Sequence, residues 1–145
     1  CIRDRMCTDR KIPEIRREKK ENFDRLKAGL AGTEDKLILP VPCENSRPSW
    51  FGFLITCKEG VDRNKVVQYV ENHGVQTRML FAGNLTKHPC FDQMRATGEG
   101  YRIVGELTNT DRIMNDTFWV GVYPGMTDEM IDYMAKTIKE AVDQQ

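Results

Sequence analysis

The sequence predicts an α/β fold of the two-layer α+β type, in which a sheet of three or four short strands carries helices on one face. Residues 50–57 and 117–123 are rich in aromatic and β-branched residues, as strands are. Residues 63–73 and 127–142 repeat apolar residues at helical spacing. Together with residues 75–80, they give the order strand, helix, strand along the middle of the chain. At 145 residues, the chain is one domain or a piece of a larger protein.

Composition excludes several classes of protein. The 22 basic and 22 acidic residues are interspersed and cancel to a net charge of zero, so no basic stripe indicates a nucleic-acid partner. The longest uncharged apolar runs, such as residues 50–57, are far shorter than the about 20 residues of a membrane span. The five cysteines are scattered without a CxxC pair, which argues against a disulfide framework or a self-contained metal site. We therefore expect a cytoplasmic protein without a nucleic-acid or membrane partner.

The first part of the chain divides into two segments. Residues 1–8 show no usable pattern and begin with CIRDR, which looks like a translated sequencing adapter, so we expect this segment to be unstructured and non-native. Residues 9–32 predict a connecting helix, with Asp9 as its cap and Pro13 in its first turn. The apolar stripe is thin for this length, which is typical of a helix that spans between two domains. The stripe consists of Ile12, Ile15, Phe23, Leu26 and Leu30.

Residues 33–145 supply the rest of the predicted domain. Residues 37–39 form a short apolar strand that Pro40 stops, and Gly52 indicates a bulge or a close backbone approach in the strand that follows. Residues 101–107 are either a strand or a connector.

The predicted helices carry clear end signals. Asp62 starts the helix 63–73, and Gly74 ends it in a left-handed conformation. A short helix follows the N-cap candidates at residues 108–111, and Thr127 caps the last helix.

The stretch 74–89 carries the candidate ligand-binding groups. Arg78 lies on a predicted strand, and Asn84 and Thr86 follow on a loop, where an exposed amide and hydroxyl can hold an anionic or polyhydroxyl ligand. The alternative is an ordinary strand with a solvated Arg78 and a polar turn.

The uncovered face of the sheet is the second candidate. We expect it to carry aromatic side chains and to meet another domain or subunit, because a monomeric domain rarely leaves so many in water. No GxGxxG, P-loop, GxSxG or HExxH motif is present, so the residues indicate a binding or accessory domain. The face would carry part of the following set: Trp50, Phe51, Phe53, Phe118, Trp119 and Tyr123.

Three strings carry a family resemblance: residues 48–53 (PSWFGF), 76–86 (QTRMLFAGNLT) and 109–125 (NTDRIMNDTFWVGVYPG). They closely resemble the DegT/DnrJ/EryC1/StrS sugar aminotransferase superfamily, and within it the CDP-4-keto-6-deoxy-D-glucose 3-dehydrase branch, the lipopolysaccharide biosynthesis proteins of the RfbH type. The resemblance covers about residues 9–142, with a somewhat longer loop at 95–100, and residues 1–8 depart from it.

The resemblance implies that residues 33–145 are the small C-terminal domain of a fold type I PLP-dependent aminotransferase fold. The full-length homodimer would use pyridoxal or pyridoxamine 5'-phosphate and a [2Fe-2S] cluster to remove the C3 hydroxyl of a CDP-linked 4-keto-6-deoxy sugar, with a flavin/iron-sulfur reductase as partner. The cofactor and cluster ligands would belong to a large N-terminal domain. We therefore expect this fragment to hold no catalytic residue, cofactor or metal and to be inactive alone.

The resemblance also implies a set of residues that line the substrate cleft. Arg78 and Arg112 offer planar donors to phosphate or to paired sugar oxygens. Two alternatives stay open: a sugar aminotransferase of the same superfamily, which lysine rather than histidine at the upstream Schiff-base position would indicate, and a stand-alone binding domain without catalysis. The predicted substrate- or cofactor-binding residues are Trp50, Phe51, Arg78, Asn84, Thr86 and Arg112.

Overall fold

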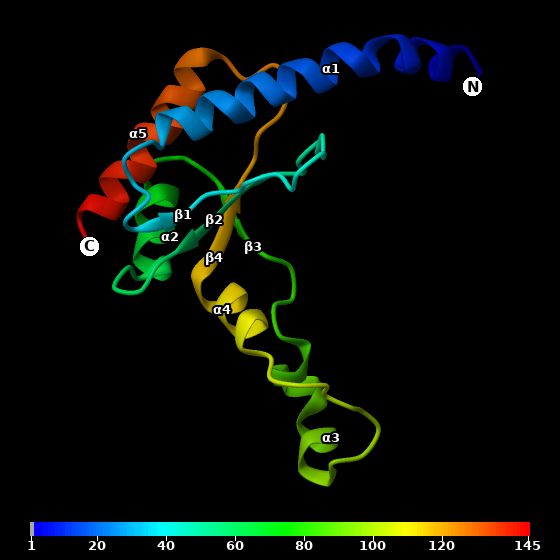
Figure 1. The fold of residues 1–145 in the computed structure, drawn as a ribbon, viewed down its shortest axis with the longest axis vertical. Helices are drawn as coiled ribbons and strands as arrows, with labels where there is room; N and C mark the ends of the chain where they lie inside the picture. The colour runs from blue at the N-terminus through cyan, green and yellow to red at the C-terminus, as the bar shows by residue number, and fades with distance from the viewer. Residues whose placement is uncertain (1) are drawn as a thin grey trace.

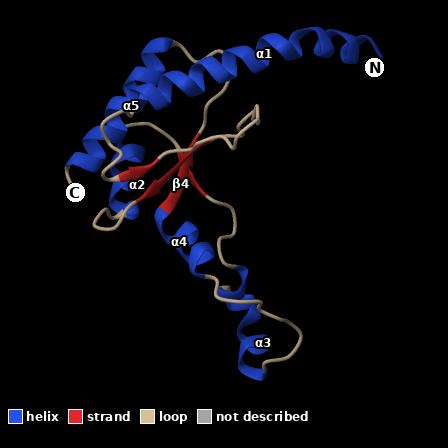
Figure 2. Cartoon of the chain, viewed as in Figure 1, coloured by secondary structure: helices blue, strands red, loops and turns tan. Residues whose placement is uncertain are grey.

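The computed structural model describes the backbone of residues 2–145 and the side chains of residues 11–145. Its centre is a sheet of four strands, β1 (Leu37–Ile38), β2 (Phe53–Cys57), β3 (Thr77–Met79) and β4 (Thr117–Val120), shown in red in Figure 2. The strand order is β1-β2-β4-β3, and every neighbouring pair is antiparallel. The predicted two-layer fold with three to four strands is therefore confirmed.

One face of the sheet is covered by three helices, α1 (Ile2–Gly29), α2 (Arg63–Asn72) and α5 (Asp128–Asp143) (Figure 1). Alternate residues of β2 and β4 point into this layer and are fully buried, among them Phe53 and Phe118. The prediction that the two later helices cover one face is confirmed, and the C-terminal half of α1 joins them. The helices and Leu30, which directly follows α1, contribute to this core; the helical residues are Phe23, Leu26, Val66, Val70, Ile131, Ile138 and Val142.

Three of the predicted helix-end signals, Asp62, Gly74 and Thr127, are confirmed. Helix α4 (Thr108–Asp116), in contrast, begins after Leu107 and has no side-chain cap. Asp62 accepts hydrogen bonds from the amides of Asn64 and Lys65, and the Thr127 hydroxyl accepts from the amide of Met130. Gly74 has a φ of 78°, the left-handed conformation that follows a helix end.

Helix α1 is held on α5 by one arginine as well as by core packing. The Arg25 guanidinium lies 2.7 Å from a carboxylate oxygen of Asp128 and 2.7 Å from one of Asp132. The hydrogen bond from Arg25 lowers the pKa of Asp132 below its usual value. These two ion pairs therefore orient the connecting helix α1 on α5 at neutral pH.

Helix α1 differs from the prediction at its start. It begins at Ile2 and runs through Asp9, so the backbone of residues 2–8, which we expected to be unstructured, is helical. Arginine and methionine in this stretch favour helix, and no glycine or proline interrupts them before Pro13. Ile15, one of the predicted stripe residues, is 43% exposed because the N-terminal half of α1 extends past the domain (Figure 1).

The strands are shorter than predicted. Residues 50–52 lie outside β2, and β3 ends at Met79. Residues 101–107 form a connector, which settles the alternative that the sequence left open. Gly105 within it has a φ of 71°, a conformation that does not fit a strand. Phe53 and Phe118, two of the six aromatic residues of which the uncovered face was expected to carry a part, are core residues instead.

Between β3 and β4 the chain leaves the sheet and forms an arm of short helical segments (Figure 1). The arm consists of η1 (Leu85–Lys87), η2 (Pro89–Phe91), α3 (Asp92–Thr97) and α4 (Thr108–Asp116). Within the described part of the chain, none of the helices combines the length and the apolar character that a bilayer crossing needs.

Replacing Leu26 by alanine should destabilise the domain by about 2–5 kcal/mol, because a fully buried leucine then leaves a cavity between α1 and the sheet. The matched control is Ile15→Ala on the exposed half of the same helix, which should change stability by less than about 0.5 kcal/mol. Urea unfolding followed by tryptophan fluorescence measures both. Equal effects of the two substitutions would contradict the packing of α1 on the core.

Candidate functional site

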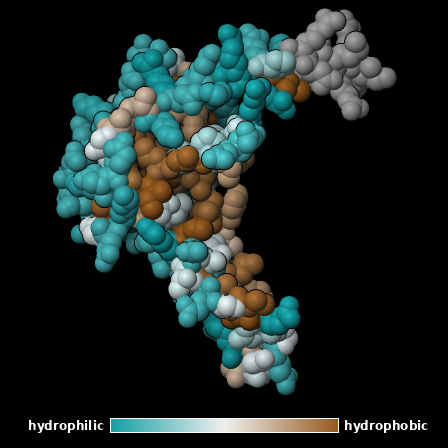
Figure 3. All heavy atoms as spheres, in the orientation of Figure 1, coloured by the Kyte–Doolittle hydropathy of each residue, from teal (hydrophilic) through white to brown (hydrophobic). Residues whose placement is uncertain are grey.

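The sheet face opposite the three helices is open to solvent and carries the candidate site. Strand register places Leu54, Trp119 and Arg78 side by side on it, one residue from each of β2, β4 and β3. Figure 3 shows apolar side chains gathered over the sheet between α1 and α4. The prediction of an apolar, aromatic uncovered face therefore holds for this row.

Trp119 occupies the centre of the row. Its indole N–H donates to the carbonyl oxygen of Met79 at 3.2 Å. The ring of Phe51 meets the indole edge-on, with 5.2 Å between ring centroids and 62° between planes. The Phe51 side chain is 73% exposed, so Trp119 supports an aromatic ring that is presented to solvent. Trp119 belongs to the aromatic set expected for the uncovered face but not to the predicted binding residues.

Gly52 explains how the indole comes so close to β2. A Cβ atom on this glycine would lie 2.5 Å from Cε3 of Trp119, far inside van der Waals contact. The predicted close backbone approach at Gly52 is therefore confirmed, and the approaching group is the Trp119 ring.

Arg78 stands next to Trp119 at the edge strand and is exposed. Its Nη1 donates to the carbonyl oxygen of Thr77 at 2.9 Å. When the Gln76 amide oxygen faces the guanidinium, it accepts from Nη1 at 3.1 Å and from Nη2 at 2.7 Å. These contacts orient the guanidinium, and its exposure leaves donors for a ligand anion.

The turn after β3 is strained. Phe81 has a φ of 48°, a left-handed conformation that aromatic residues rarely adopt, and its side chain is 79% exposed. The amide of Phe81 donates to the carbonyl oxygen of Met79 at 2.8 Å, the same oxygen that accepts from Trp119. Backbone strain at an exposed aromatic residue is common at binding sites.

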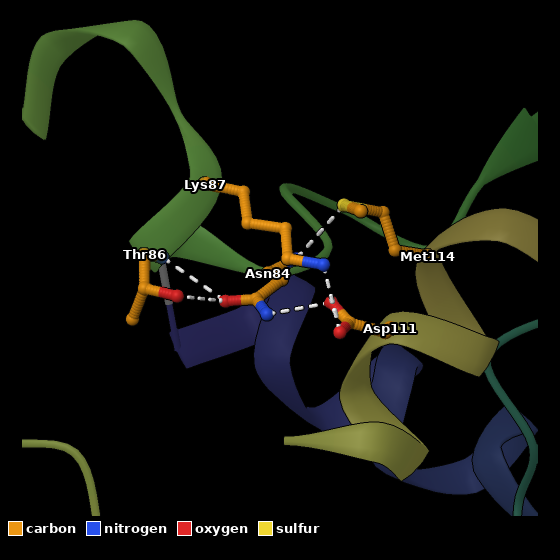
Figure 4. A network of polar contacts seen from close by, with 5 residues as sticks. All are labelled: Asn84, Thr86, Lys87, Asp111 and Met114. Carbon is orange, nitrogen blue, oxygen red and sulfur yellow. Dashed lines mark hydrogen bonds and ion pairs between the residues drawn. The ribbon is translucent and has the colours of Figure 1, made fainter. Parts of the chain in front are cut away.

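A buried amide then fixes the loop to α4 (Figure 4). The Asn84 side-chain oxygen accepts from the amide of Thr86 at 3.1 Å and from its hydroxyl at 2.7 Å. The Asn84 side-chain nitrogen donates to Asp111 at 2.7 Å, and Lys87 forms an ion pair with the other oxygen of that carboxylate at 2.8 Å. The backbone nitrogen of Asn84 also lies 3.3 Å from the sulfur of Met114.

This network changes the interpretation of two predicted binding residues. Asn84 is 2% exposed, so the expectation of an exposed amide on this loop is wrong. Its side chain and the Thr86 hydroxyl bond to each other, and together they shape the loop. Asp111 and Met114, the residues on α4 that hold the loop, were not predicted. The sequence offered only the position of Asp111 among N-cap candidates.

The other two predicted residues, Trp50 and Arg112, lie outside the three strands of the row. Trp50 stacks on Phe23 of α1, with 5.5 Å between centroids and 8° between planes. It therefore faces the connecting helix, whereas its neighbour Phe51 faces Trp119. Arg112 is exposed on α4.

The arrangement is suited to binding. Among the described residues, no group of three His, Cys, Asp or Glu side chains gathers as a metal site would require. Burial raises the pKa of the Cys57 thiol to about 11, so it is not a nucleophile near neutral pH. The open face instead combines an exposed aromatic ring with an oriented cation.

Comparison with known proteins assigns the class. The model of the DegT/DnrJ/EryC1/StrS aminotransferase family matches residues 10–139. The chain therefore belongs to this family, as the resemblance predicted.

Two curated relatives are nearly half identical to this chain in sequence. The chain is 48% identical to the lipopolysaccharide biosynthesis protein RfbH of Salmonella typhimurium, over 90% of this chain and 29% of that protein. It is 46% identical to dTDP-4-dehydro-2,6-dideoxy-D-glucose 3-dehydratase of Saccharopolyspora spinosa, over 91% of this chain and 28% of that enzyme. The chain thus spans about three tenths of the length of these relatives.

The solved structure is the GDP-4-keto-6-deoxy-D-mannose-3-dehydratase of E. coli with bound hydrated PLP. It matches 89% of this chain and 32% of its own with a TM-score of 0.72 at 21% identity. This likeness confirms the predicted aminotransferase fold.

Replacing Lys87 by methionine should raise the pKa of Asp111 toward its usual value of 3.8. The hydrogen bond from Lys87 lowers this pKa most in the folded protein, and the hydrogen bond from Asn84 is the second-largest cause. The bond therefore stabilises the loop above pH 3.8, and its contribution is lost as the pH falls through the lowered pKa. Carbon-13 NMR of the Asp111 carboxyl measures the pKa. Lys65→Met on α2 is the control, and an Asp111 pKa unchanged by Lys87→Met would contradict the network.

Proposed function

We propose that this chain supplies one wall of the substrate cleft of a nucleotide-sugar 3-dehydratase of deoxysugar and lipopolysaccharide biosynthesis. Two relatives that are nearly half identical bear the names of a lipopolysaccharide biosynthesis protein and of a sugar 3-dehydratase. The single observation that carries the proposal is the open row in which Trp119 supports Phe51 and lies beside Arg78.

A nucleotide sugar has the parts that this row can recognise. Its base is planar and can stack on the exposed Phe51 ring. Its diphosphate is an anion that accepts two parallel hydrogen bonds from a guanidinium such as that of Arg78. We propose that Trp50, which stacks on α1, and Arg112 of α4 make outer contacts in the same cleft. Asn84 and Thr86 shape the loop that borders it.

The reactive groups belong, in this proposal, to a large domain outside these residues. Pyridoxamine 5'-phosphate and a [2Fe-2S] cluster would supply the chemistry that removes the C3 hydroxyl of the sugar. Cys43, Cys57 and Cys90 do not fit a cluster, because Cys57 is buried in the core while the other two are exposed. The residues of this chain bind and orient the nucleotide sugar and help to exclude water from it.

Several finer features rest on the family resemblance and complete the proposal. The full-length protein is a cytoplasmic homodimer that takes a CDP-linked 4-keto-6-deoxy sugar and receives electrons from a flavin/iron-sulfur reductase. The 145 residues alone bind no cofactor and have no activity.

The proposal is tested by expressing the chain together with the large domain and supplying a CDP-linked 4-keto-6-deoxy sugar, the cofactor and a reductase. Mass spectrometry of the product should show loss of the C3 oxygen. Transfer of an amino group to the sugar without that loss would identify a sugar aminotransferase and contradict the proposal.

In this full-length enzyme, Arg78→Ala should raise KM for the nucleotide sugar at least about tenfold, because a charge-assisted contact to an anion is lost. Thermal stability should change little, since Arg78 is exposed. Arg102→Ala, an exposed arginine in the connector of the arm, is the matched control and should leave KM unchanged. Equal KM values for Arg78→Ala and the unmodified enzyme would remove Arg78 from the cleft.

A further inference from the structure

Trp119 makes three contacts that converge on the exposed groups of the open face. Its ring closes on the backbone of Gly52 at a distance that excludes a Cβ atom. It meets the edge of Phe51. Its indole N–H donates to the carbonyl oxygen of Met79, the residue directly after Arg78. One side chain thus joins the residues that precede β2 to the end of β3.

The contact with Met79 bears directly on the guanidinium. Arg78 and Trp119 are register partners, so their side chains project from the same face of neighbouring strands. Met79 is the last residue of β3, and beyond it the chain turns through Phe81 in a strained conformation. The carbonyl oxygen of Met79 also accepts from the amide of Phe81, and without the indole bond it would lose its side-chain partner. The end of the strand that carries Arg78 would then be less firmly held.

We propose that Trp119 is a positioning residue for nucleotide-sugar binding: its ring supports Phe51, and its N–H fixes the strand end that carries Arg78. This inference rests on the proposed function and adds a residue that acts through Arg78 and Phe51. Gly52 is required for the same positioning of Trp119, because any side chain there would displace the indole.

The test uses the full-length enzyme and separates the two contacts of the indole. Trp119→Phe keeps an aromatic ring and removes the N–H, and Trp119→Leu removes both. We expect KM for the nucleotide sugar to rise about threefold to tenfold in Trp119→Phe, the range for loss of one neutral hydrogen bond. It should rise further in Trp119→Leu and Gly52→Ala, with kcat changing less than KM.

The matched control is Tyr133→Phe. It also removes one hydrogen bond from a side chain to a backbone carbonyl, that of Tyr133 to His73 at 2.9 Å, but on the helical side of the domain. It should leave KM unchanged. A similar rise of KM in this control would mean that general loosening of the domain, rather than positioning, explains the effect of Trp119→Phe.

A double-mutant cycle decides whether Trp119 acts through Arg78. In the Arg78→Ala background, Trp119→Phe should add much less to KM than it does alone, because the group that it positions is gone. Full additivity, or a KM unchanged by Trp119→Phe, would overturn this inference while leaving the proposed function intact. An unchanged KM in Arg78→Ala alone would instead contradict the proposed function.

Discussion

Burial of one face of a four-stranded sheet is the constraint on which the rest of the structure depends. Leu26 of α1 and Leu30, which directly follows α1, pack with α2 and α5 on the inward residues of β2 and β4, and these side chains are excluded from water. The period of two along a strand then sends every other residue to the opposite face. Trp119 and Arg78 are on that face because Phe118 and Val120 are in the core. The same packing that stabilises the domain therefore arranges the candidate site.

Close contacts hold the open face in shape, and they restrict which residues and backbone conformations the chain can have at positions 52 and 81. Gly52 gives up a side chain so that the indole can lie on the backbone, and Phe81 adopts a left-handed φ where the chain leaves the sheet. A part-buried hydrogen bond from Asn84 to Asp111 attaches the following loop to α4. Rigid groups at the edge of a sheet are suited to a ligand that must be held in one orientation for chemistry on a neighbouring domain.

The sequence predicted the layers well because hydrophobic periodicity and caps are local signals. Asp62 and Thr127 cap helices as predicted, and the close approach at Gly52 was anticipated from a glycine between two phenylalanines. The site was harder to predict, because the direction of a side chain depends on strand limits that the pattern does not define. Trp50 and Phe51 were expected together, yet they lie against different elements, since β2 begins only after them.

The central claim is that the open face forms a wall of a nucleotide-sugar cleft. A crystal structure of the full-length enzyme with a bound nucleotide sugar tests this claim most directly. In that structure, the Arg78 guanidinium should lie within hydrogen-bonding distance of the ligand, and the Phe51 ring should be in van der Waals contact with it. A structure in which both side chains face bulk solvent or an interface away from the ligand would contradict the account.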